Sequence, residues 1–300
     1  MNQKNNDKKS NNEDWWKVYV KQMNADKTLA IHSGYFEKGI KTHEEAIINK
    51  NKVIEKLLNL EKLGKKKSII LDAGCGVGGT CIYLAKNYPH IKFLGLNVSP
   101  IQIKLAPKFS KQSQVSSNTD FILGDFLEIG LKDKSIDGIF AIESITRAND
   151  IKRFLQEASR ILKINGKIVI DDAFIFRKPS RYLTKLVYKA YCKTWKIPSM
   201  ESFEIFKTDL KELKFYDIKI KEITKNTWLS FFIINLKFLI YSFFSNPGQK
   251  IKSTENNAIN EKSSILNNSL VHTFLMFSTS IILILNRNVR KVIITAVKKG

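Results

Sequence analysis

The residues with the clearest chemical potential lie in one short loop, 71–80, which reads LDAGCGVGGT. The apolar run 68–73 leads into this loop and predicts a buried strand, and a helix is expected to begin at Thr80. Glycines at such a turn let the backbone approach a ligand closely, and the first N–H groups of a helix have no partners within it. We therefore expect a ligand-binding loop.

Asp72 indicates which ligand the loop would take. The glycines alone leave the choice open, because Gly74, Gly76 and Gly79 also match the G-x-G-x-x-G spacing of dinucleotide-binding folds, and a glycine turn without a ligand is a third interpretation. A carboxylate two residues before the first glycine would repel a pyrophosphate. It would attract a cationic amino group, such as that of S-adenosylmethionine (SAM), so Asp72 favours SAM.

Polar residues also follow the next two predicted strands. An acid at the end of the second strand commonly binds ribose hydroxyls, and here the amide of Asn97 would do so together with Gln102. A turn or helix-cap role is the alternative for Asn97, although Ser99 is the better cap. After the third strand, Asp125 would meet an adenine amino group and Phe126 its ring, unless Asp125 belongs to a simple acidic turn.

These residues need a sheet that brings strand ends together. Apolar runs predict strands that alternate with amphipathic helices, which implies an α/β fold with a parallel sheet and helices on both faces. The expected strands are 68–73, 91–96, 121–123, 136–142 and 167–171, and the expected helices are 80–86, 99–109 and 150–163. Farther on, we expect a helix at 203–214 and strands at 215–223 and 290–298.

Composition limits the class of protein. The chain has 300 residues, of which 43% are hydrophobic and 26% charged, so it is globular. Three cysteines, without zinc-ligand spacing, exclude a disulfide framework and a metal site, and residues 1–14 are polar and resemble a disordered tail, not a signal peptide. With no long apolar segment, a cytoplasmic protein is expected. The net charge of +22 indicates an anionic partner, although only seven of the 50 basic residues are arginine, which also fits biased base composition.

Taken in order, five segments resemble the class I SAM-dependent methyltransferases. They are LDAGCGVGGT (71–80), GLNVSPIQI (95–103), FILGDF (121–126), IDGIFAIES (136–144) and FLQEASRILKINGKIVIDD (154–172). In addition, AIHSGYF (30–36) and THEEA (42–46) resemble the lid of a small-molecule subgroup that includes sterol, tocopherol and natural-product methyltransferases. The resemblance covers about residues 15–225 and the final strand, and is weak over 226–289.

The resemblance implies a Rossmann-like sheet of seven mostly parallel strands, the last antiparallel. It divides the chain into a helical lid (15–64), a SAM-binding core (65–173), a substrate cap with remaining core elements that include strand 215–223 (174–289), and a last core strand (290–300). It also implies a set of residues in contact with SAM: Ser33, Asp72, Gly74, Cys75, Gly76, Gly78, Asn97, Gln102, Asp125 and Phe126.

The resemblance and the residue chemistry also suggest candidate catalytic residues. Relatives often carry His or Tyr near position 147, but Arg147 stays protonated and is no general base. Glu143 matches an acid of sterol-type enzymes, which implies that it steadies a cation or positions the substrate; a structural carboxylate is the alternative. His32, Tyr35 and His43 are candidate bases by their chemistry alone, and a structural His is the alternative.

The later chain contains a basic amphipathic helix. Positive charges recur at 181, 185, 189 and 193, and the segment 177–196 has seven basic residues and no acid. This pattern favours a peripheral contact with an anionic membrane, against the alternative of a solvated helix face. The apolar runs 227–244 and 270–285 predict a substrate cap, a shallow membrane contact or core helices.

The leading hypothesis is a methyltransferase that moves a methyl group by direct in-line transfer to a hydrophobic small molecule. A prenylated, sterol-like, quinone, phenolic or natural-product acceptor fits it. An RNA or DNA methyltransferase is an alternative because of the charge, but the fourth strand lacks a Pro-Pro motif and no cysteine follows a proline. A non-catalytic SAM-binding, membrane-associated protein is another alternative.

Overall fold

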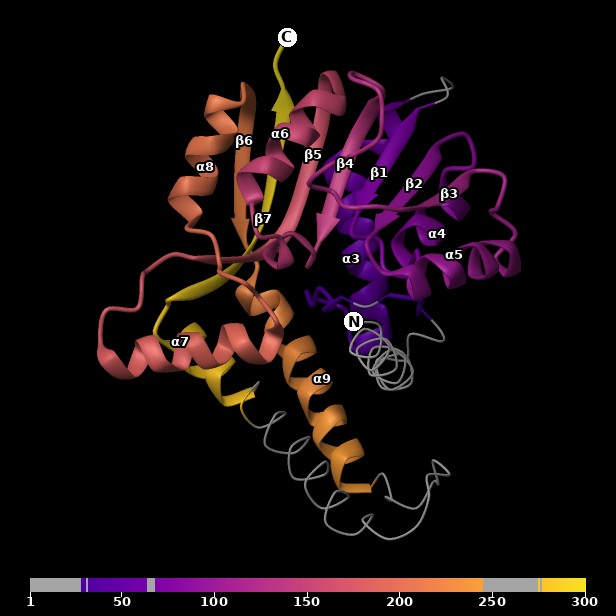
Figure 1. Cartoon of the computed structure of the whole chain (residues 1–300). Helices are drawn as coiled ribbons and strands as arrows, with labels where there is room; N and C mark the ends of the chain where they lie inside the picture. Colours follow the sequence, from indigo (N-terminus) through magenta and orange to yellow (C-terminus); the bar gives the residue numbers. More distant parts are fainter. Residues whose placement is uncertain (1–27, 31, 64–67, 245–274, 276) are drawn as a thin grey trace, which may run out of the picture.

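The structure is a computed structural model that describes residues 28–30, 32–63, 68–244, 275 and 277–300. Its centre is a seven-stranded sheet in the order β3-β2-β1-β4-β5-β7-β6 (Figure 1). The strands are β1 (Ile69–Ala73), β2 (Lys92–Asn97), β3 (Thr119–Leu123), β4 (Ile136–Ile142), β5 (Leu162–Ile175), β6 (Phe215–Glu222) and β7 (Val289–Lys298).

The sheet is parallel from β3 to β5, and β7 runs antiparallel between β5 and β6. This confirms the predicted fold of seven strands with an antiparallel last strand. Strand β1 lies between β2 and β4, so the direction of the crossovers reverses beside β1. Ligands of open α/β sheets bind at the carboxyl ends of the strands at such a reversal.

Helices cover both faces of the sheet. Buried residues of α3 and α4 pack on the face that carries Ile70 and Phe140, while those of α6 and α8 pack on the face that carries Leu71 and Ile139. Neighbouring residues of a strand point to opposite faces, so both faces of the central strands must be apolar. The helices are α3 (His43–Leu58), α4 (Gly79–Asn87), α5 (Pro100–Gln112), α6 (Ile151–Ile161), α7 (Tyr182–Trp195), α8 (Phe203–Glu212) and α9 (Thr224–Phe244), with 3-10 turns η1 (Leu60–Leu63) and η2 (Ile145–Arg147).

The predicted elements agree with the observed ones except at two places. Residues 32–42, within the predicted helical lid, are not helical, and α3 begins after Thr42, whose side chain forms a capping box with Glu45. In addition, the predicted strand 167–171 is part of a longer strand, β5, which begins at Leu162. Residues 162–166 therefore belong to the strand. Asn165 supplies the bend, with φ 65°. The predicted tail, 1–14, lies outside the described residues.

Three helices gather beyond the carboxyl end of the sheet: α7, α9 and the helix at 277–285 (Figure 1). They meet through aromatic rings, since Phe231 lies 6.3 Å from Trp195 and stacks on Phe277 at 6.1 Å, measured between ring centroids. The side chain of Trp195 also donates a hydrogen bond to Ser280 (3.2 Å). Within the described residues, no helix is both long and apolar enough to cross a membrane.

Candidate active site

The glycine loop lies between β1 and α4, at the reversal of the sheet. Gly74, Gly76 and Gly78 have φ values of 97°, 59° and 85°, which L-residues with a side chain rarely adopt. A Cβ at Gly74 would also lie 2.3 Å from the Cβ of Ser144, at the end of β4. Glycine is therefore required here both for the turn and for the close approach of the β1 and β4 ends.

Asp72 has a buried carboxylate without a cation beside it. Among the described residues, its one hydrogen bond comes from the thiol of Cys81, with 3.5 Å between Sγ and Oδ2. Burial raises the pKa of Asp72 to about 7, and the Cys81 thiol opposes this shift. A buried carboxylate without a partner is costly, so the site fits a ligand that brings a positive charge, as the amino group of SAM does.

The two amide side chains predicted at the end of β2 lie together. The Nδ2 group of Asn97 donates to Oε1 of Gln102 at 2.5 Å and to the carbonyl of Gly76 at 3.3 Å. Ser99 caps α5, as predicted, and its side chain accepts from Gln102 N. Thus Asn97 connects the glycine loop to the start of α5, where a ribose would meet the loop.

Asp125 and Phe126 follow β3, as predicted. Asp125 is exposed, and its Oδ1 accepts from the backbone N–H of Leu127 at 2.9 Å, as in an acidic turn. The ring of Phe126 packs edge-on against Phe154, with 5.3 Å between centroids. The loop therefore offers the other carboxylate oxygen of Asp125 to a ligand, while Phe126 is held by the core.

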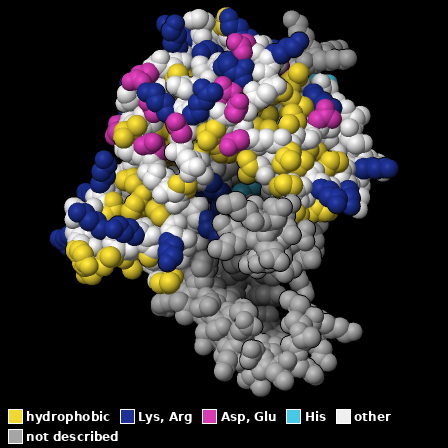
Figure 2. Space-filling view, in the orientation of Figure 1, with side chains coloured by type: hydrophobic (Ala, Val, Ile, Leu, Met, Phe, Trp, Pro, Cys, Tyr) yellow, Lys and Arg dark blue, Asp and Glu magenta, His cyan; other side chains and the backbone are white. Residues whose placement is uncertain are grey.

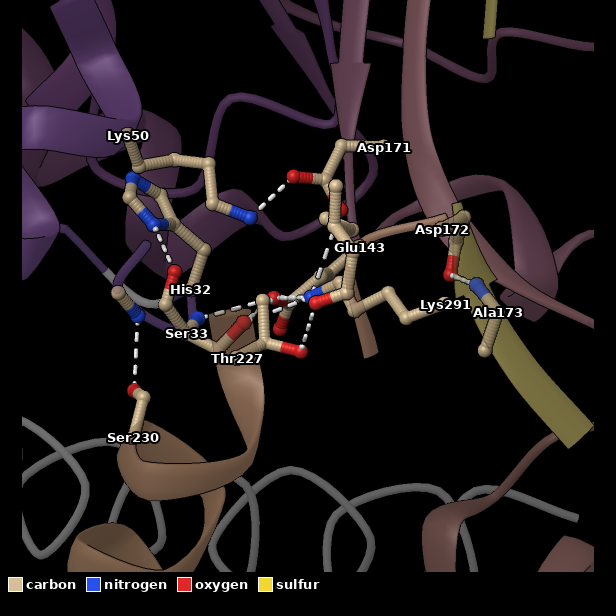
Figure 3. A network of polar contacts seen from close by, with 12 residues as sticks. His32, Ser33, Lys50, Glu143, Asp171, Asp172, Ala173, Thr227, Ser230 and Lys291 are labelled. Atoms are coloured by element: carbon tan, nitrogen blue, oxygen red, sulfur yellow. Dashed lines mark hydrogen bonds and ion pairs between the residues drawn. The ribbon is translucent and has the colours of Figure 1, made fainter. Parts of the chain in front are cut away.

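A second polar group lies at the carboxyl ends of β4, β5 and the start of β7 (Figure 3). The Glu143 carboxylate accepts hydrogen bonds from the backbone N–H of Ser33 (2.9 Å) and from its hydroxyl, and forms an ion pair with Lys291. The ammonium of Lys291 also donates to the Ser33 hydroxyl at 2.7 Å. All of these contacts to Glu143 use Oε1, so the lid, β4 and β7 are joined at one carboxylate oxygen.

Behind this group, Lys50 of α3 and Asp171 of β5 form an ion pair in which both side chains are fully buried. Lys291 lies 3.4 Å from the other oxygen of Asp171, Oδ1, which accepts no hydrogen bond in the described structure. Burial lowers the pKa of Lys50, and Asp171 opposes this shift. Lys50, Asp171, Lys291 and Glu143 therefore form a chain of alternating charges from α3 to the site.

The electrostatics of the group keep Glu143 ionised. Burial would raise the pKa of Glu143, but the charges of Lys291 and Lys50 outweigh it and hold that pKa far below its ordinary value. Conversely, Asp171 and Glu143 outweigh the burial of Lys291 and raise its pKa. Glu143 also has φ 50°, a strained left-handed conformation that costs about 1 kcal/mol or more.

The two histidines near the site are neutral. His32 is buried; its Nδ1 lies 3.1 Å from the Ser33 carbonyl, and burial, followed by the charge of Lys50, lowers its pKa. The Nε2 atom of His43 lies 2.8 Å from the Ser230 hydroxyl, which itself accepts from Gly34 N at 2.7 Å. Ser230 therefore donates to His43, whose pKa burial lowers to about 4.

Tyr35 and Arg147 lie apart from the Glu143 group. The Tyr35 ring is buried in the core, with the ammonium of Lys221 5.3 Å from its centroid. Arg147 is exposed and donates to the carbonyl of Trp195 at 3.3 Å. Within the described residues, no cluster of His, Cys, Asp and Glu is arranged to hold a metal ion.

Sequence reasoning missed Lys50, Asp171 and Lys291. The pair Asp171 and Asp172 closes an apolar strand, and that unusual doublet could have marked the site. Asp172 is held by Thr146, which donates through its N–H (3.1 Å) and its hydroxyl (3.0 Å). Lys50 and Lys291 stand among many other lysines, so nothing local distinguishes them.

Comparison with known proteins identifies the family. Residues 64–204 match the model of a methyltransferase domain. Norajmaline N-methyltransferase of Rauvolfia serpentina is 30% identical over 207 residues, which make up 66% of this chain and 70% of that protein. A sterol 24-C-methyltransferase of Aspergillus fumigatus is 33% identical over 106 residues, or 35% of this chain and 28% of that protein.

The fold agrees with a solved structure as well. Geranyl diphosphate C-methyltransferase from Streptomyces coelicolor A3(2), in complex with Mg²⁺, geranyl-S-thiolodiphosphate and S-adenosyl-L-homocysteine, superposes with a TM-score of 0.65 at 13% identity. The alignment covers 94% of this chain and 92% of that chain. The chain therefore belongs to the SAM-dependent methyltransferases of class I, among the small-molecule enzymes, and SAM is its methyl donor.

Proposed function

We propose that this enzyme methylates a hydrophobic small molecule at an atom that needs no deprotonation, such as an amine nitrogen or an alkene carbon. The observation that carries the proposal is the ionised Glu143 carboxylate, held by Lys291 and Ser33 at the carboxyl edge of the sheet. A carboxylate in this state is a poor base but stabilises a nearby cation. Methylation of a neutral amine or alkene creates such a cation.

The other candidate bases support the same choice. His43 has a pKa of about 4, and its Nε2 atom already accepts a hydrogen bond from the Ser230 hydroxyl. His32 is buried and neutral, and Tyr35 lies in the core. Because an efficient general base has a pKa near the working pH, none of these groups is suited to remove a proton from a phenol or alcohol.

The mechanism we infer is direct and in-line. When bound, SAM would supply an electrophilic methyl group on a positively charged sulfur, and that sulfur would take back the electrons of the broken carbon–sulfur bond. The glycine loop and Asp72 position the donor, and the Oε2 atom of Glu143 faces the acceptor and stabilises the charge that it gains. An amine that carries a hydrogen then loses a proton to solvent, and the carbocation formed from an alkene loses a proton from a neighbouring carbon. Alignment and exclusion of water contribute most of the acceleration.

The aromatic cluster beyond the sheet edge supports a hydrophobic acceptor. Trp195, Trp228, Phe231 and Phe277 come from α7, α9 and the helix at 277–285, and Trp228 stacks on Phe231 at 6.0 Å. The N-terminal turn of α9 reaches the lid, because Ser230 contacts both Gly34 and His43. We infer that these rings cover the acceptor, and the similarity of the chain to a norajmaline and a sterol methyltransferase supports this inference.

The test uses labelled SAM with matched hydrophobic acceptors that differ only in carrying an amine, an alkene or a phenol. We expect turnover of the amine or the alkene, and Glu143→Gln should lower kcat by about 10- to 100-fold with SAH affinity within about twofold of wild type. Turnover confined to the phenol, at a rate that follows its ionisation, would overturn the proposed acceptor class. Absence of SAH binding by folded protein would overturn the cofactor site itself.

A further inference from the structure

The side of helix α7 that faces solvent carries two kinds of residue in parallel rows. Arg181, Lys185, Lys189 and Lys193 recur every four residues and are all exposed. Beside them, Tyr182, Leu183 and Leu186 are 75%, 73% and 46% exposed. At 100° per residue, the six of these side chains that belong to α7 span about 160°, one continuous half of the helix, and Arg181 is its N-cap. We call these seven residues the outer face of α7.

The positive charges on and around this face have no anionic partner in the described structure. Arg177, Lys178 and Lys196 flank the helix, and like the four basic residues of the outer face they are exposed and take part in no ion pair among described residues. No acid occurs between residues 177 and 196. Figure 2 shows the resulting row of Lys and Arg along α7, with hydrophobic side chains at its edge.

The opposite side of α7 packs towards the active site. Val187, Tyr188, Tyr191 and Cys192 pack against Ile175 of β5 and Val289 of β7, among others. Burial, followed by the charge of Asp172, raises the pKa of Tyr191, so this side chain lies within the electrostatic reach of the site.

We propose that the outer face of α7 docks the enzyme on an anionic membrane surface. The leucines and Tyr182 enter the boundary between headgroups and acyl chains, while the lysines lie along the helix at the level of the lipid phosphates. Exposed leucine side chains are unfavourable in water, and the cations beside them have no anionic partner in the described structure. An anionic membrane surface would bury the leucines and pair with the cations. The inference adds a partner to the proposed function: an acceptor dissolved in the bilayer would reach the site past α7.

The experiment is co-sedimentation of the full chain with vesicles of pure phosphatidylcholine or with roughly one-third phosphatidylglycerol. We expect binding only to the anionic vesicles, with an affinity that falls steeply as salt rises, because the Debye length is about 10 Å at 0.1 M salt. Each lysine near the surface contributes about fivefold, so the triple variant Lys185→Gln, Lys189→Gln, Lys193→Gln should bind roughly a hundredfold more weakly.

A matched control separates this face from general charge. Lys104, Lys108 and Lys111 are exposed on α5, on a different part of the molecule (Figure 1), and their replacement by Gln removes the same charge. This control should retain most of the binding, whereas Leu183→Ser with Leu186→Ser should lose it although all charges remain. Every variant is first shown to bind SAH as the wild type does.

Several results would overturn the proposal. Among them are no binding to anionic vesicles, equal losses in the α5 and α7 triple variants, and an unaffected leucine variant. A dimer in sedimentation velocity that dissociates in the leucine variant would assign the face to a second copy of the chain. Failure of docking with intact SAH binding and turnover overturns only this inference, while vesicle binding without SAH binding overturns the proposed function.

Discussion

At the residue scale, the decisive groups are carboxylates whose surroundings differ. Asp72 is buried without a cation, whereas Glu143 is held beside Lys291. The same chemical group therefore has a raised pKa at one place and a lowered pKa at the other. The two carboxyl groups therefore suit different roles. Asp72 becomes ionised when it binds a positively charged ligand, whereas Glu143 is ionised without one.

Replacement of Asp72 by Asn should weaken SAH binding and stabilise the ligand-free protein. The amino group of the ligand needs the ionised carboxylate, so wild-type affinity should rise as pH increases from 6 to 8, through the Asp72 pKa of about 7. A raised folded-state pKa in an acid means that stability is lost as pH rises from about 4 to about 7, by about 4 kcal/mol at most. Asp72→Asn removes that loss.

Calorimetric titration with SAH and urea unfolding, each at several pH values, check both halves of this prediction. The variant should bind SAH with little dependence on pH and should unfold at higher urea than wild type above pH 7. A variant that binds SAH like wild type, with the same pH dependence, would contradict the assigned role of Asp72.

Replacement of Lys291 by Met should change the pH profile of the enzyme. Without this ammonium, burial dominates at Glu143 and its pKa rises, so the acid limb of kcat/KM should move to higher pH. Arg290→Gln is a matched control on the same strand, because it removes one charge from the exposed pair with Glu222. An unchanged acid limb in Lys291→Met would show that Glu143 does not take part in turnover.

At the element scale, α3 is fixed to the sheet by a charge pair in an otherwise apolar layer. Lys50 of α3 reaches Asp171 of β5, and neither side chain is exposed. Around the pair, Ile54 and Leu58 of the same helix pack on the sheet face. Apolar contacts thus provide the attraction, and the ion pair sets the position of the helix, and with it the lid, relative to the site.

Replacement of Lys50 by Met should destabilise the protein by about 3–5 kcal/mol, because it leaves Asp171 buried with only Lys291 near it. Urea unfolding measures the change in free energy. The control is Lys52→Met, which alters an exposed lysine two residues away on α3 and should change stability by about 0.5 kcal/mol or less. Similar effects for the two variants would mean that the buried pair does not position α3.

At the scale of the whole molecule, the candidate cofactor site joins segments that are distant in sequence. Ser33, Asp72, Asn97 and Asp125 come from the lid, β1, β2 and the loop after β3. A ligand that touches all of them binds only the folded chain. Its binding energy therefore adds to the stability of the whole unit, not to that of a single element.

SAH at about 100 times its dissociation constant should raise the free energy of unfolding by about 2.7 kcal/mol. Thermal unfolding followed by circular dichroism, with and without SAH, measures this as a shift of a single transition. At the same SAH concentration the shift should be smaller in Asp72→Asn, because this variant binds SAH more weakly. Two separate transitions, of which only one responds to SAH, would instead show that the lid or the α7–α9 region unfolds independently of the site.

The sequence by itself determined the sheet and the cofactor loop. Strands and helices follow from local apolar periodicity, and the turn at 74–78 follows from glycines that no other residue replaces at positive φ. Both depend on neighbours in sequence. The closeness of Asn97 and Gln102, which we expected to bind a ribose together, is of the same kind, because the two residues are five positions apart.

Only the tertiary structure decided the charges at the site. Lys50, Glu143, Asp171 and Lys291 lie on four elements, and their order in sequence gives no measure of their distances in space. A lysine in a chain with 43 lysines has no local mark of burial, and a pKa depends on surroundings that the fold assembles. The sequence therefore identified the cofactor, whereas the fold determined that Glu143 is ionised and that Asp72 is buried without a cation.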